Sequence, residues 1–195
     1  MYVRPVTAPE LTMATARRKA KRRVAPKPKG LPIPRGFHTV TPSLAVVGGV
    51  AALEFYKKAF GAKELQRQVT PSGQLIHGRL RIGDSIVMLS DVFRGSDRSA
   101  PSTVETTTVT LHIYTTDVES LWNRAVDAGA KVTMPLDDMF WGERYGHLVD
   151  PFGHHWSLST PIRMSKSVRE AKRKESMRAF TKGEDPDKVP SFTDI

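Results

Sequence analysis

The sequence has no cysteine and no long apolar run, and each absence excludes a class of protein. Without cysteine among its 195 residues, the chain forms no disulfide and offers no thiolate to a metal ion or a substrate. No apolar run approaches the roughly 18 residues that a membrane-spanning helix needs. The first 30 residues also lack the apolar core of a secretory signal. We therefore predict a cytoplasmic protein without a membrane partner.

Acidic residues are too few to balance the basic ones, but the imbalance lies at the two ends of the chain. Lys and Arg number 30 against 20 Asp and Glu, a net charge of +10. Residues 1–35 carry ten basic residues and one acidic residue, whereas residues 163–195 carry nine and six. The 127 residues between them have a net charge of −2. The excess that would attract a polyanion therefore belongs to the termini.

Composition divides the chain into three parts. We predict that residues 1–35 form a disordered basic arm, because they hold too few large apolar side chains to offset the entropy of ordering. Met13 is a second candidate start within this arm. Residues 36–162 are predicted to fold as one domain. Residues 163–195 form a charged extension, with a short exposed helix expected over residues 165–180.

Within the domain the hydrophobic pattern indicates a duplicated β-α-β-β-β unit. The first copy predicts a strand, a helix and three strands at residues 40–47, 50–60, 63–70, 74–82 and 85–91. The second copy predicts the same order at residues 108–115, 118–126, 131–134, 147–150 and 155–160. Gly61 and Gly129 end the two helices at a spacing of 68 residues. We therefore predict an α+β fold with repeats at about 38–91 and 108–160, and a ligand cleft between them.

Three strings within the duplicated unit carry a resemblance to a known family. VTPSLAVVGGVAALEFYKKAFGAKEL, HGRLRIGDSIVML and FWGERYGHLVDPFGHHWSL resemble the vicinal oxygen chelate superfamily, in its PhnB-like branch. This superfamily includes glyoxalase I, extradiol dioxygenases and the fosfomycin and bleomycin resistance proteins. The resemblance covers about residues 37–162. It implies a glyoxalase-like fold, a small-molecule ligand and a homodimer, and it leaves lyase, isomerase, dioxygenase and simple binding functions open.

The resemblance also implies a metal site with four ligands, and the sequence departs from it. The superfamily's metal enzymes carry His or Glu on the first and last strand of each copy, where the matching residues here are Thr41, Val87, Thr110 and Ser157. None of these is a good ligand for a first-row metal ion, so the usual divalent metal is not expected. A displaced site made by His77, His112 and Glu143 is the alternative.

Residues 140–146, FWGERYG, form the most unusual string, and residues 140–145 are predicted to form a loop. Trp141 and Tyr145 are suited to stacking on a ligand, while Arg144 is suited to binding its carboxylate or phosphate group. In the alternative interpretation the loop closes a sheet edge and Arg144 pairs with Glu143 or Asp150. The predicted ligand-binding residues of the cleft are His77, His112, Trp141, Glu143, Arg144, Tyr145 and Trp156.

Two functions follow from these patterns. The first is a glyoxalase-like or bleomycin-resistance-like protein that binds or transforms a small molecule in the cleft. The second is a nucleic-acid-associated protein that acts through its basic arm, which would give nonspecific phosphate contacts because no aromatic residues interleave the charges. A solvated tail is the simpler interpretation of the same charge run.

Overall fold

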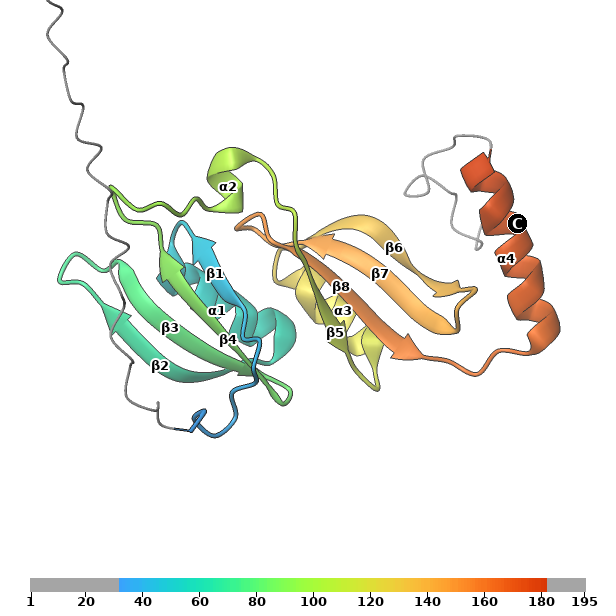
Figure 1. The fold of residues 1–195 in the computed structure, drawn as a ribbon, viewed down its shortest axis with the longest axis horizontal. Coiled ribbons are helices and arrows are strands. Elements are labelled where there is room, and N and C mark those ends of the chain that lie inside the picture. Colours follow the sequence, from blue (N-terminus) through green and yellow to red (C-terminus); the bar gives the residue numbers. More distant parts are fainter. Residues whose placement is uncertain (1–31, 182–195) are drawn as a thin grey trace, which may run out of the picture. The chain divides into compact units, whose positions relative to one another are not determined.

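The structure of the protein is a computed structural model that describes residues 32–181 (Figure 1). The predicted arm, apart from residues 32–35, lies outside this range, as do residues 182–195 of the predicted extension. Between residues 32 and 181 no helix combines the length and the apolar composition needed to cross a membrane.

Two βαβββ modules follow one another along the described chain and confirm the predicted α+β fold (Figure 1). The first module consists of β1 (Ser43–Val46), α1 (Gly49–Phe60), β2 (Lys63–Val69), β3 (Leu75–Ile82) and β4 (Ser85–Asp91). The second consists of β5 (Thr110–Tyr114), α3 (Val118–Asp127), β6 (Lys131–Met139), β7 (Glu143–Val149) and β8 (His155–Pro161). The short helix α2 (Pro101–Val104) lies between the modules, and α4 (Lys166–Thr181) follows the second.

The two sheets share their strand order and their registers. The orders are β1-β4-β3-β2 and β5-β8-β7-β6, and in each module the first and last strands pair in parallel. Met88 of β4 pairs with Ser43 of β1, as Ser157 of β8 pairs with His112 of β5. Met88, rather than the predicted Val87, is therefore the counterpart of Ser157. A one-residue shift turns a strand side chain to the opposite face, and Val87 belongs to the buried core.

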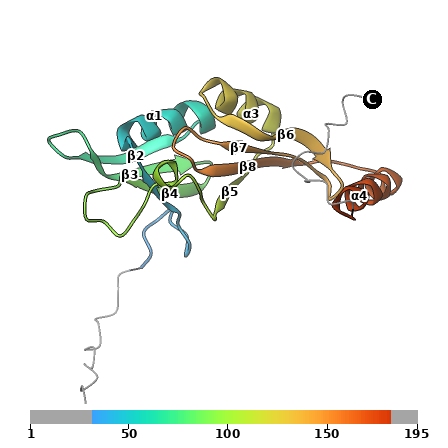
Figure 2. The same cartoon turned by 90° about the horizontal axis from the view of Figure 1, so that it is seen from above.

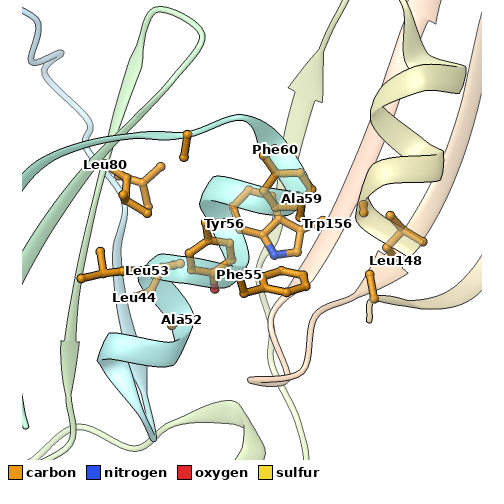
Figure 3. Packing of buried hydrophobic residues seen from close by; sticks show 14 of the residues in the cluster. Leu44, Ala52, Leu53, Phe55, Tyr56, Ala59, Phe60, Leu80, Leu148 and Trp156 are labelled. Carbon is orange, nitrogen blue, oxygen red and sulfur yellow. The ribbon is translucent and has the colours of Figure 1, made fainter. Parts of the chain in front are cut away.

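One helix covers one face of each sheet, and the helix-covered faces share a single core. Figure 2 shows α1 over the first sheet and α3 over the second. The helices also pack against each other, and buried side chains from both modules form one cluster. In this cluster Tyr56 and Phe60 of α1 contact Trp156 of β8, with ring centroids 5.5 and 4.6 Å apart (Figure 3). This apolar contact joins the two halves of the duplication.

The structure differs from the sequence prediction most clearly between β6 and β7. Half of the predicted loop over residues 140–145 is strand, because β7 begins at Glu143, and β6 runs to Met139 directly before it. Only Phe140, Trp141 and Gly142 form the turn, which Gly142 closes with a φ of 95° and a hydrogen bond to the carbonyl of Met139. Arg144 of this segment pairs across the hairpin with Asp138 of β6, which is consistent with a strand at this position.

Candidate ligand-binding site

Alternation along the strands gives the second sheet a helix-covered face and an open face. Trp156 and Leu158 of β8 pack in the core, so the side chains between and after them point to the open side. The same alternation in β5 and β7, together with the β6–β7 turn, gathers a set that we call the aromatic face, namely His112, Tyr114, Trp141, Glu143, Tyr145 and His147. Four of its six members were predicted from the sequence.

His112 lies at the centre of the aromatic face and is held by two serines of β8. Its Nδ1 lies 2.7 Å from Oγ of Ser157, and its Nε2 lies 3.1 Å from Oγ of Ser159. Both serines are buried, with 2% and 0% of their surface exposed, so they lie beneath the imidazole. Burial lowers the pKa of His112, and the negative charge of Glu143 partly opposes this shift. His112 is therefore a fixed, mainly neutral group at physiological pH.

Aromatic rings extend this centre toward the β6–β7 turn. The ring of Tyr145 stacks on His112 at 5.8 Å, and its hydroxyl lies 2.5 Å from Nε2 of His147. Trp141 meets Tyr145 edge to face at 5.5 Å, and Tyr114 meets His112 in the same way at 4.3 Å. Trp141 and Tyr114 remain 44% and 65% exposed. Such exposed aromatic surface beside polar groups is typical of a binding site.

Glu143 places a carboxylate among these rings. One of its oxygens accepts a hydrogen bond of 3.1 Å from the hydroxyl of Tyr114, and the other accepts one of 3.2 Å from Nε1 of Trp141. The hydrogen bond and the charge of Glu143 raise the pKa of Tyr114, so this phenol stays protonated. The aromatic face is therefore both negatively charged and rich in π-systems, which suits a positively charged planar ligand.

A cavity of about 640 Å³ adjoins the aromatic face, and both modules line it. The second module contributes residues 111–114 of β5 and Trp156. The first module contributes the turn between β3 and β4, and the segment before β1 adds His38 and Val40. His112 and Tyr114 belong to both the cavity and the aromatic face, so a ligand can contact the two together. The volume lies within the range of about 300–1,000 Å³ that is common for small-molecule sites.

Three of the predicted ligand residues do not lie on the aromatic face. His77 belongs to β3 of the other sheet, where it pairs with Gln68. Arg144 forms ion pairs with Glu119 of α3 and Asp138 of β6, at 2.5 and 3.0 Å, instead of pairing with Glu143 or Asp150. Alternation along β7 explains this placement, because neighbours of Glu143 and Tyr145 face the opposite side of the sheet.

Trp156 is 2% exposed and lies in the cavity wall rather than on the aromatic face. Its indole Nε1 donates a hydrogen bond of 2.8 Å to Oδ2 of Asp150. The same oxygen accepts 2.7 Å from the hydroxyl of Tyr56, and Oδ1 accepts from the backbone amides of Phe152 and His154, each at 2.9 Å. Burial raises the pKa of Tyr56 well above its usual value, and the charge of Asp150 raises it further, so Tyr56 remains a donor. Asp150 therefore holds the two modules together beneath the cavity.

The residues at the superfamily's metal positions do not fit a metal ion. The registers place Met88 and Ser157 at equivalent points of the two sheets, while Thr41 lies two residues before β1 and Thr110 begins β5. A thioether and hydroxyl groups are poor substitutes for the imidazole and carboxylate ligands of a first-row metal. The alternative trio of His77, His112 and Glu143 is not brought together, and no group of three His, Asp or Glu side chains within residues 32–181 could hold a metal ion.

The sequence profile of the Glyoxalase/Bleomycin resistance protein/Dioxygenase superfamily matches residues 37–158, which span both modules. The chain belongs to this superfamily. An uncharacterized protein of Mycobacterium bovis is 46% identical over 127 residues, covering 64% of this chain and 84% of the relative. An uncharacterized protein of Mycobacterium tuberculosis is also 46% identical over 127 residues. The match covers 64% of this chain and 75% of the relative.

Solved structures agree with membership in the superfamily. A gene product of Arabidopsis thaliana is 28% identical with a TM-score of 0.53, and covers 63% of this chain and 98% of its own. TioX from Micromonospora is 26% identical with a TM-score of 0.52, and covers 63% and 97%. A PhnB protein from Bacillus cereus is 18% identical with a TM-score of 0.51. The match covers 63% of this chain and 99% of the Bacillus protein, and at this identity it shows the fold alone.

Two members of the aromatic face were missed in the sequence. Tyr114 and His147 each follow a predicted residue by two positions, after His112 and Tyr145 respectively. Period-two alternation along the predicted strand at residues 108–115 already indicated Tyr114, and it would have indicated His147 if residues 143–149 had been recognised as a continuous strand.

Proposed function

We propose that the protein binds a small planar aromatic cation on the aromatic face and in the adjoining cavity, as a member of the PhnB-like branch of its superfamily. The observation that carries this proposal is the carboxylate of Glu143, which is set between Tyr114 and Trp141. A cation over these rings would gain both the π attraction and the charge of Glu143. An anionic ligand is disfavoured, because Arg144 is already paired on the other face.

Binding is favoured over covalent chemistry at this site. The Ser157 hydroxyl contacts His112, as a nucleophile would contact its base, but the serine is only 2% exposed beneath the ring. The second nitrogen of the imidazole is engaged by Ser159, and no carboxylate of residues 32–181 forms a hydrogen bond with the ring. Substrate could not reach this hydroxyl without displacing His112.

Fluorescence titration with proflavine, a planar aromatic cation, tests the proposal. We expect saturable binding, and we expect Glu143→Gln and Trp141→Ala each to weaken it about tenfold, which corresponds to about 1.4 kcal/mol. Glu105→Gln is the matched control, because it removes an equal charge from an exposed residue in the loop between the modules. Equal affinity for neutral acridone or for anthraquinone-2-sulfonate would contradict the proposed preference for a cation.

We also infer that the protein forms a homodimer through the open faces of its sheets. The open face of the first sheet carries Arg79, whose guanidinium lies 5.7 Å from the ring of Phe37, and Arg98, which donates to Ser90. The open face of the second sheet carries Glu143. Opposite charge on the two faces supports pairing the first sheet of one copy with the second sheet of another, so the aromatic face and its ligand would lie between the two copies.

Sedimentation equilibrium of the full chain tests the dimer. We expect a mass of twice 21.7 kDa, and we expect Arg79→Glu to shift the population toward the single chain. Lys58→Glu, which makes the same charge change on an exposed residue of α1, should leave the mass unchanged. A single-chain mass for the unaltered protein at all concentrations would overturn the dimer.

Nucleic-acid association through the basic arm remains the second candidate function. It is favoured by the net charge of +9 on residues 1–35 beside a domain of −2. Replacing Arg17, Arg18, Lys19 and Lys21 by Gln in the full chain should reduce retention on duplex DNA at low salt. If retention on DNA is unchanged, the arm does not bind DNA and is a solvated tail.

A further inference from the structure

Helix α4 carries a stripe of positive charge that the aromatic face does not use. The helix spans Lys166–Thr181 and contains six basic and two acidic residues, a net charge of +4. Lys166, Arg169 and Arg173 are spaced i, i+3 and i+7, which places them along one side of the helix. All three are exposed, and none has an ion-pair partner among residues 32–181. We call these three residues the α4 stripe.

The start of α4 is fixed against the second module. A Cβ atom built on Gly142, in the β6–β7 turn, would lie 2.9 Å from Nη2 of Arg169, so the guanidinium and the turn are in close approach. The backbone amide of Ile162 also donates 2.9 Å to the carbonyl of Gly142, which ties the chain just before the helix to the same turn. The stripe therefore belongs to an anchored helix, in which Arg169 contacts the turn at one edge and is still exposed to solvent.

We propose that the α4 stripe is a docking surface for the phosphate backbone of duplex DNA. Lys166 and Arg173 are separated by about 10 Å along the helix axis, at 1.5 Å per residue. Phosphates of one strand follow one another at about 3.4 Å along the axis of duplex DNA, so this span covers about three phosphate steps. Contacts of this kind attract DNA without reading its sequence.

The distribution of apolar residues on α4 favours DNA over a membrane surface. Val168 and Met177 are 47% and 44% exposed, but they lie nine residues apart and hence on opposite sides of the helix. A helix that lies in a bilayer interface needs one continuous apolar side. The described residues of α4 offer no such side, whereas their charge has one sign along the α4 stripe.

Fluorescence anisotropy with a labelled DNA duplex and the full chain tests this proposal. We expect Lys166→Gln, Arg169→Gln and Arg173→Gln together to weaken binding about tenfold at low salt. The slope of log affinity against log salt should fall by about 2 to 3, because about 0.9 counterions are released per contact. The matched control combines Lys58→Gln, Lys63→Gln and Lys131→Gln, which remove the same charge from exposed residues of the modules. Far-ultraviolet circular dichroism confirms that both variants keep their helices.

The outcomes separate α4 from the other surfaces of the chain. A tenfold loss in the α4 variant and a less than twofold loss in the control would support the α4 stripe. Equal losses in both variants would overturn it, because binding would then depend on net charge or on the N-terminal arm. Loss of binding to phosphatidylserine vesicles without loss of binding to DNA would also overturn it. Proflavine binding should be unchanged in the α4 variant, so failure here and failure of the proposed function are distinguishable.

Discussion

Replacing Asp150 by alanine is expected to lower the free energy of unfolding by about 3–5 kcal/mol. The carboxylate is 4% exposed and accepts hydrogen bonds from Tyr56, Trp156 and two backbone amides. Alanine removes every acceptor and leaves these donors unsatisfied in a site from which water is largely excluded. Tyr56 belongs to the first module and Trp156 to the second. Losing their shared acceptor therefore weakens the packing of the two modules against each other.

Urea denaturation followed by circular dichroism measures this effect. Asp84→Ala is the matched control, because Asp84 lies in the equivalent turn of the first module but is exposed, and its carboxylate accepts a hydrogen bond from the hydroxyl of its neighbour Ser85. It should change the free energy of unfolding by less than about 0.5 kcal/mol. Tyr56→Phe, which removes one donor with its partner left in place, should fall between the two variants. If Asp150→Ala is no more destabilising than Asp84→Ala, Asp150 does not hold the modules together.

Replacing Gly146 by alanine should cost about 2–3 kcal/mol of folding free energy, at the upper end of the range for overpacked cores. A Cβ atom on this residue of β7 would lie 2.6 and 2.7 Å from the indole ring of Trp122, and 3.1 Å from Cα of Leu136. The indole is wedged between α3 and the sheet, and the backbone of β6 closes the other side. The chain has no direction in which to relax without separating the helix from the sheet.

Gly78 provides the control because it occupies the equivalent place in β3 of the first module. The three atoms nearest to a Cβ there would be the Cδ2 atoms of Leu53, Leu75 and Leu89, at 3.0–3.2 Å. These side chains can shift by tenths of an ångström, so Gly78→Ala should cost about 1 kcal/mol or less. Adding Trp122→Phe to Gly146→Ala should restore part of the lost stability, seen as a favourable coupling in a double-mutant cycle. Additive losses would show that the indole is not the obstacle.

The fold could be predicted from the sequence because its signals are local. Helix α1 ends at Gly61, which has a φ of 62°, and helix α3 begins after Asp117, whose side chain accepts from the amide of Ser120. Turn residues and period-two alternation placed most of the strands. The similarity of the two copies then indicated that the units repeat, and the matching sheet registers bear this out.

The candidate site could be predicted only in part, because side-chain direction depends on strand boundaries. A loop over residues 140–145 would allow Arg144 and Tyr145 to reach one ligand together, whereas a strand sends them to opposite faces. The ion pair of Arg144 with Glu119 joins a strand to a helix, and the pair with Asp138 depends on the register of the β6–β7 hairpin, so composition reveals neither. Asp150 was missed as a structural residue for the same reason, since its partner Tyr56 is 94 residues away.

Nuclear magnetic resonance titration of the full chain with proflavine tests the central claim most directly, because it locates the ligand. The account predicts saturable shifts of the ring resonances of His112 and Tyr145 and of the indole N–H of Trp141, while His77 on the other sheet is unaffected. Glu143→Gln should reduce these shifts at the same proflavine concentration. Shifts that do not saturate, or that are confined to the first sheet, would contradict a ligand site on the aromatic face.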